Sequence, residues 1–110
     1  MKEKDSFIIN FLGQNNIKQI YVDINVFAGE VKTNMIQLNG YQFKEYYNAN
    51  KIYFIITINE RLNSEEVKFE VIALKNAFYS IQYYFVRDGD DSNERNDLEP
   101  GTSYLVNIRF

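Results

Sequence analysis

The stretch EVKFEVIALKNAFYSIQYYFV, residues 66–86, decides the fold of this chain. Apolar and polar side chains alternate in its first six residues, and alternation returns after the polar break LKNA at 74–77. A period of two places successive side chains on opposite faces, which is typical of a half-buried β-strand and not of a helix. The inward positions are expected to be Val67, Phe69, Val71, Tyr79, Ile81, Tyr83 and Phe85.

The same period extends outward from this stretch to most of the chain. It recurs in IKQIYVDINVFAGEV at 17–31 and in SYLVNIRF at 103–110, and turn-forming Asn and Gly residues stand between the runs. The pair Asn39–Gly40 predicts a hairpin between its two flanking runs. The run IYFIITI at 52–58 is apolar on both faces, so we expect it inside a sheet, and it is too short to span a bilayer. About eight strands are predicted, roughly at 6–12, 18–28, 31–38, 41–47, 51–59, 66–73, 77–86 and 102–110, which indicates an all-β, antiparallel sandwich or jelly-roll-like fold.

The composition mainly excludes classes of function. With 110 residues the chain suits one domain, and its formal net charge of −3 argues against a nucleic-acid binder. The chain has no Cys and no His, which excludes Cys- or His-based metal sites and the Ser-His and Cys-His nucleophiles. The carboxylates outside 88–99 are scattered and the glycines are isolated, so we expect no enzyme.

The segment between the last two predicted strands is acidic. Residues 88–99 hold six carboxylates and one arginine, Arg95. Their spacing resembles a twelve-residue calcium loop, but Asn93 stands where such a loop needs Gly, and both flanks are strands instead of helices. We therefore expect a solvated loop or linker at 88–101 and no cofactor, with calcium as the alternative. The ligands in that alternative are Asp88, Asp90, Ser92, Glu94, Asn96 and Glu99.

Tyrosines and the final strand are the other candidate sites. Tyrosines that point outward could stack on a sugar or fill a protein interface, although sheets favour aromatic residues in any case. The final strand, 102–110, is apolar, and it either completes its own sandwich (1–87) or is donated to a neighbouring subunit or module. The candidate contact residues are Tyr21, Tyr53, Tyr84, Tyr104, Val106, Ile108 and Phe110.

The order of strands and turns resembles a known kind of module. The stretches SFIINFLGQNNIKQIYVDINVFAGEVKTN (6–34) and FEVIALKNAFYSIQYYFV (69–86) resemble β-sandwich modules of the bacterial pre-peptidase C-terminal type and their relatives repeated in large surface and secreted proteins of protists. Gly29–Glu30 stands where that family usually has Gly-Asp. The resemblance implies a non-catalytic adhesive or structural module.

Two functions follow as expectations. The first is a structural or interaction module, one unit of a tandem or polymeric extracellular or cell-surface assembly, with protein partners that include further copies of itself. The alternative is a carbohydrate-binding module that uses outward tyrosines, with or without calcium. A cytoplasmic location stays open, because a core of this size needs no disulfide in any compartment.

Overall fold

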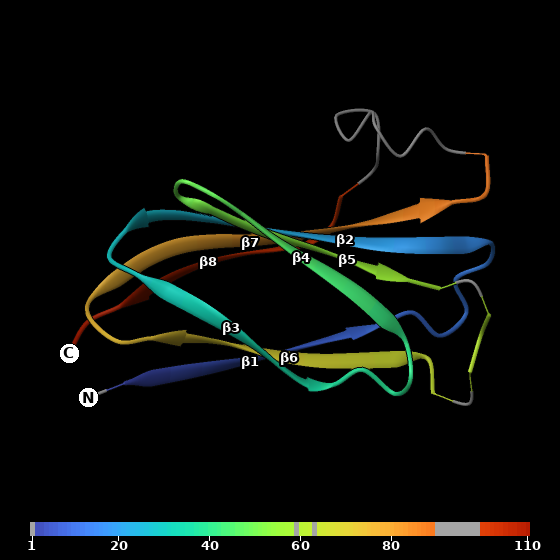
Figure 1. Ribbon diagram of the computed structural model, residues 1–110, viewed down its shortest axis with the longest axis horizontal. Helices are drawn as coiled ribbons and strands as arrows, with labels where there is room; N and C mark the ends of the chain where they lie inside the picture. Colours follow the sequence, from blue (N-terminus) through green and yellow to red (C-terminus); the bar gives the residue numbers. More distant parts are fainter. Residues whose placement is uncertain (1, 59, 63, 90–99) are drawn as a thin grey trace.

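A computed structural model describes residues 2–58, 60–62, 64–89 and 100–110, and these contain eight strands and no helix (Figure 1). Accordingly, the described residues include no helix that is long and apolar enough to cross a membrane. The strands are β1 (Glu3–Asn10), β2 (Ile17–Ala28), β3 (Val31–Gln37), β4 (Gln42–Asn48), β5 (Lys51–Thr57), β6 (Glu66–Ala73), β7 (Ala77–Arg87) and β8 (Pro100–Ile108).

The strands form two antiparallel sheets that pack face to face. The three-stranded sheet has the order β1-β6-β3, and the five-stranded sheet has the order β4-β5-β2-β7-β8. Figure 1 shows the smaller sheet below the larger one, with both ends of the chain at the left-hand end of the molecule. The predicted all-β antiparallel sandwich is confirmed, and β5 lies inside its sheet as its apolar sequence indicated.

The first strand begins earlier than predicted. It pairs with β6 from Glu3, opposite Ala73, to Asn10, opposite Glu66, so three charged residues precede the apolar run within the strand. β1 is an edge strand, where charged side chains reach water and discourage pairing with other molecules. Phe11 leaves the strand and is fully buried, and its N–H bonds the Glu65 carbonyl at 2.9 Å.

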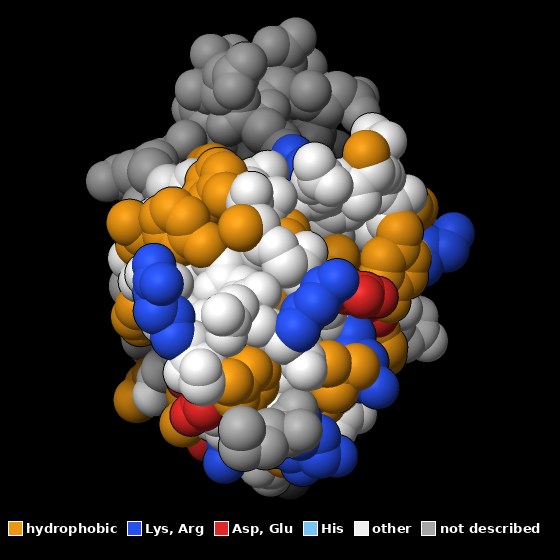
Figure 2. All heavy atoms as spheres, turned by 90° about the vertical axis from the view of Figure 1, so that its left-hand side faces the viewer, with side chains coloured by type: hydrophobic (Ala, Val, Ile, Leu, Met, Phe, Trp, Pro, Cys, Tyr) orange, Lys and Arg blue, Asp and Glu red, His pale blue; other side chains and the backbone are white. Residues whose placement is uncertain are grey.

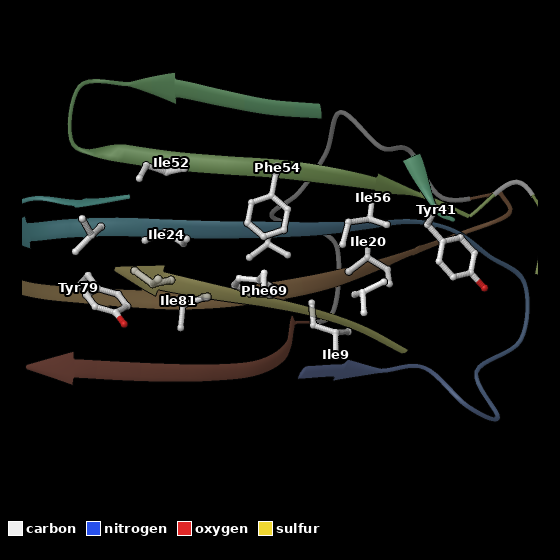
Figure 3. Packing of buried hydrophobic residues seen from close by; sticks show 14 of the residues in the cluster. Ile9, Ile20, Ile24, Tyr41, Ile52, Phe54, Ile56, Phe69, Tyr79 and Ile81 are labelled. Atoms are coloured by element: carbon white, nitrogen blue, oxygen red, sulfur yellow. The ribbon is translucent and has the colours of Figure 1, made fainter. Parts of the chain in front are cut away.

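The core lies between the two sheets and consists of alternate residues from each (Figure 3). Ile20 and Phe54 of the large sheet are fully buried, and Phe69 of the small sheet is 1% exposed. The Phe54 and Phe69 rings meet edge to face, with centroids 5.0 Å apart at 82°. Each such side chain contributes roughly 1.5–3 kcal/mol when it leaves water, so this layer is the main stabilising feature of the fold.

Side chains close both open sides of the sandwich. On one side Tyr79 of β7 is 1% exposed, and its hydroxyl donates to Asp5 Oδ2 of β1 at 3.2 Å. Burial, together with the negative charge of Asp5 and this hydrogen bond, raises the pKa of Tyr79 well above the ordinary value. On the other side the Thr33 hydroxyl of β3 donates to the Glu45 carboxylate of β4. The sheets are therefore joined at both margins by polar contacts.

The predicted hairpin at Asn39–Gly40 is wrong. The turn itself forms, with φ values of 55° and 91°, and the Tyr41 N–H bonds the Leu38 carbonyl at 3.1 Å. The flanking strands diverge, however, because β3 pairs with β6 in one sheet and β4 pairs with β5 in the other. Tyr41 directs this crossover, since its buried hydroxyl donates to the Ser64 carbonyl at 2.8 Å and accepts from the Leu62 N–H at 3.0 Å.

Candidate functional site

The outer face of the five-stranded sheet carries most of the candidate tyrosines. Tyr21 lies outside the main core, in a second cluster with Val86, whereas its chain neighbours Ile20 and Val22 belong to the main core. Residues directly opposite each other in neighbouring strands share a face. The pairing therefore defines three outward rows across β4, β5 and β2, which are Gln42–Thr57–Gln19, Lys44–Ile55–Tyr21 and Tyr46–Tyr53–Asp23.

Tyr46 and Tyr53 form a stacked pair in the last of these rows. Their ring centroids are 4.7 Å apart and the ring planes differ by 13°. Lys51 Nζ lies 5.9 Å from the Tyr53 ring centroid and 3.9 Å from Asp23 Oδ2. Asp23 is only 6% exposed, so the lysine compensates a carboxylate that is largely removed from water. Both rings are half-buried, and Tyr46 belongs to the edge strand β4 whereas Tyr53 belongs to the inner strand β5.

Tyr21 and Tyr84 form a second pair, directly opposite each other on β2 and β7. Tyr21 is 5% exposed and packs with Val86, Ile55 and Tyr84. Its hydroxyl donates to Gln19 Oε1 at 3.2 Å, and the Tyr84 hydroxyl donates to Gln82 Oε1 at 2.6 Å. Tyr21 therefore lies on the outer face, as the alternation predicted, but its ring is too covered to serve as a stacking platform.

A shallow hollow opens on this face beside β4, and we call it the β4 hollow. Its volume is about 310 Å³, near the lower limit of about 300–1,000 Å³ for ligand pockets. Its lining combines an aromatic ring and an aliphatic side chain with amide, hydroxyl and ammonium groups. The lining side chains include those of Gln19, Gln42, Lys44, Tyr46, Ile55 and Thr57.

Strand β8 forms the opposite edge of the five-stranded sheet and pairs with β7 of the same chain. Its candidate residues divide by exposure. Ile108 is 9% exposed and belongs to the core, and Val106 packs against the core, whereas Tyr104 is 46% exposed and the following Phe110 is 43% exposed. Leu105, a large hydrophobic side chain of the same strand, is 70% exposed.

Hydrophobic side chains also reach the surface at the end where the chain begins and finishes. Phe27 is 60% exposed and contacts Phe78, with ring centroids 5.3 Å apart, and Leu74 is 48% exposed. Figure 2 shows this end: its hydrophobic side chains stand in several groups separated by basic side chains and by other polar side chains or backbone. The view therefore shows no single continuous apolar patch of the kind that marks a large interface.

A second hollow, of about 520 Å³, lies beside Arg61 and Glu65 at the opposite end. Arg61 Nη1 is 3.2 Å from Glu65 Oε2 and 3.4 Å from the Phe11 carbonyl oxygen, and the guanidinium carbon lies 5.5 Å from the Phe11 ring centroid. These contacts fix the connection between β5 and β6 to the end of β1. We assign the pair a structural role because each charge is already compensated by the other.

Most of the candidate calcium loop lies outside the described residues. Of its proposed ligands only Asp88 is described; it is exposed, and its N–H bonds the Asn16 carbonyl at 2.8 Å. The others, Asp90, Ser92, Glu94, Asn96 and Glu99, fall in the remainder of the segment. Within the described ranges, no three acidic side chains come together as a metal site.

The carboxylates that could have formed a catalytic pair are engaged separately. Glu70 Oε1 accepts from Asn34 at 3.1 Å and lies 4.0 Å from Lys4 Nζ, while Glu30 lies 3.8 Å from Lys75 Nζ. Glu45 accepts hydrogen bonds from the hydroxyls of Thr33 and Tyr47. The hydrogen bond to Glu45 raises the pKa of the exposed Tyr47, and partial burial and the negative charge of Glu45 act in the same direction. The three carboxylates thus have separate partners, and they differ in burial, because Glu70 is only 8% exposed whereas Glu30 is exposed.

Sequence reasoning missed the residues around the β4 hollow. Tyr46, Gln42, Thr57 and Gln19 become neighbours only because β4 pairs with β5 and β5 pairs with β2. The signal that was available is the hairpin at Asn48–Lys51, where a two-residue loop fixes Tyr46 opposite Tyr53.

Comparison with known proteins gives no relative for this chain. No protein-family model matches it, and neither does a curated protein or a solved structure.

Proposed function

We propose that this chain is a non-catalytic interaction module that joins a protein partner through the free edge of β8. The observation that carries this proposal is the composition of the four edge strands. β1, β3 and β4 each contain charged residues, whereas β8, PGTSYLVNI, contains none. Charge on an edge strand discourages pairing with other molecules, so among the edge strands that the structure describes, the uncharged β8, nine residues long, is the best suited to strand addition.

The side chains of β8 support the same assignment. Leu105 is 70% exposed on the outer face, and Tyr104 is 46% exposed and contacts Phe7 of β1 with ring centroids 5.5 Å apart. A partner strand beside β8 would cover both side chains while its backbone pairs with the free edge. The partner is a second copy of the chain or a neighbouring module of the same type, in an extracellular or surface assembly.

Light scattering and sedimentation over a concentration series test this proposal. The wild-type chain is expected to associate as its concentration rises to about 1 mM, the limit at which weak pairing is measurable. Leu105→Lys places a charge on the edge strand and should abolish association. The matched control is Leu12→Lys, at a turn residue that is 73% exposed, which should associate like the wild type.

Two results would count against the proposal. One is a wild-type chain that stays monomeric throughout the series. The other is equal loss of association in the Leu105→Lys and Leu12→Lys variants, which would show a general effect of charge instead of an effect at β8.

A further inference from the structure

Tyr46 gives the β4 hollow a rigid apolar wall. Its ring stacks on Tyr53 with centroids 4.7 Å apart, and Tyr53 is held in turn by the contact with Lys51 at 5.9 Å. Ile55, on the central strand of the three, adds an aliphatic surface beside the ring. An aromatic wall that is already ordered loses little conformational entropy when a ligand packs against it.

Polar side chains opposite this wall can form hydrogen bonds with the hydroxyl groups of a ligand. Gln42, Thr57 and Gln19 form a straight row across β4, β5 and β2. Amides and hydroxyls both donate and accept hydrogen bonds, as sugar hydroxyls do. Among the residues that the structure describes, none forms a side-chain hydrogen bond with Gln42 or Thr57, and Gln19 is oriented by the Tyr21 hydroxyl at 3.2 Å.

Charge and size restrict the ligand further. Among the described residues, no carboxylate lines the hollow and Lys44 is its one charged lining residue, so a neutral or anionic ligand is complementary to it and a cationic one is not. A volume of about 310 Å³ suits a single small ring better than a large cofactor.

We propose that the β4 hollow binds one pyranose ring of a glycan chain. The C–H face of the sugar packs against Tyr46 and Ile55, and its hydroxyls bond Gln42, Thr57 and Gln19. A sugar that carries a carboxylate would place it near Lys44. This site is separate from the edge used in the proposed function, because β4 and β8 are the two opposite edges of the same sheet. A glycan and a protein partner can therefore be bound together.

Amide chemical-shift titrations by NMR test the site with three defined probes, cellohexaose, chitohexaose and hexagalacturonate. At least one of them should shift the resonances of 42–46 and 55–57 at concentrations up to about 10 mM. Tyr46→Ala should weaken that binding about tenfold, through the lost packing of an aromatic ring. Tyr46→Phe should retain it, because the ring and not the hydroxyl forms the wall.

The matched control is Tyr47→Ala, the next residue of β4, which is 68% exposed and bonds Glu45. It should bind like the wild type. Gln42→Ala, on the exposed edge, gives a second test through the polar row if Tyr46→Ala does not fold. If hexagalacturonate alone binds and Lys44→Gln abolishes that binding, the ligand is an acidic glycan and the proposal holds.

Three results would overturn the assignment. These are no shift with any of the three probes, shifts located away from the hollow, or binding that Tyr46→Ala and Gln42→Ala leave unchanged. Leu105→Lys should not alter the titration, so failure of the β8 proposal and failure of the glycan site are distinguished by independent variants.

Discussion

The buried side chain of Tyr79 makes a contact between the two sheets, and it also makes the stability of the fold depend on pH. Its ring belongs to the core, while its hydroxyl reaches across the sandwich to Asp5 at 3.2 Å. A phenol in this environment resists ionisation, because the phenolate would be buried beside a carboxylate. The folded chain therefore holds this proton at a pH where the unfolded chain, with an ordinary tyrosine pKa of about 10, releases it.

Alkaline unfolding measures this effect. Stability from Tyr79 is fully present below pH of about 10 and decreases above it by about 1.4 kcal/mol per pH unit. Tyr79→Phe should be about 1 kcal/mol less stable at neutral pH, through the lost hydrogen bond, and should lose stability less steeply above pH 10. Urea unfolding at pH 7 and across pH 9–11 tests both parts. Tyr47→Phe, at an exposed site, is the control that should change the slope less, and an unchanged slope in Tyr79→Phe would contradict the assignment.

At the scale of elements, the crossover from β3 to β4 depends on Tyr41. The local sequence makes the turn at Asn39–Gly40, but it does not choose the partners of the two strands. Tyr41 does so through two backbone contacts to the connection between β5 and β6, at Leu62 and Ser64. Buried backbone groups that lose a partner are costly, so this hydroxyl is a strong constraint on the path of the chain.

Tyr41→Phe tests this constraint. The variant leaves the Leu62 N–H and the Ser64 carbonyl without this partner, and we expect a loss of about 2 kcal/mol in the free energy of unfolding. Urea titration gives the value directly. Tyr104→Phe, on the exposed edge strand, should change stability by less than about 0.5 kcal/mol. A Tyr41→Phe variant as stable as the wild type would show that the crossover is held by other contacts.

The elements also show which features were predictable from sequence. Alternation identified Val67, Phe69 and Tyr79 as inward residues, and it placed Tyr84 on the outer face, because these assignments need only the period of the strand. Pairing between distant strands was not predictable in the same way. The hairpin error at Asn39–Gly40, the burial of Tyr21 and the assembly of the β4 hollow all depend on which strands become neighbours.

For the whole molecule, the topology joins segments that are far apart in the chain. β1 pairs with β6, and β2 pairs with β7, so each sheet needs long loops to close before its hydrogen bonds form. Domains dominated by such pairings fold slowly for their size. The sandwich is consequently expected to fold in one slow, cooperative step, because the local β4–β5 hairpin supplies only a small part of its pairing.

Stopped-flow refolding measured by tyrosine fluorescence tests that expectation, since the chain has nine Tyr and no Trp. The time constant should lie between about 1 ms and 1 s. Leu12→Lys, at an exposed turn, should refold at the wild-type rate. Refolding within microseconds would contradict the dominance of distant pairings.

The position of the two ends of the chain has a mechanical consequence. Both lie at the same end of the molecule, with β1 in one sheet and β8 in the other (Figure 1). A load between them acts across the strands. It would separate β1 from β6 beginning at Ala73, and β8 from β7 beginning at Ala77, one hydrogen bond after another. Such unzipping needs little force compared with shearing of a whole strand. Under tension this sandwich should therefore extend at low force.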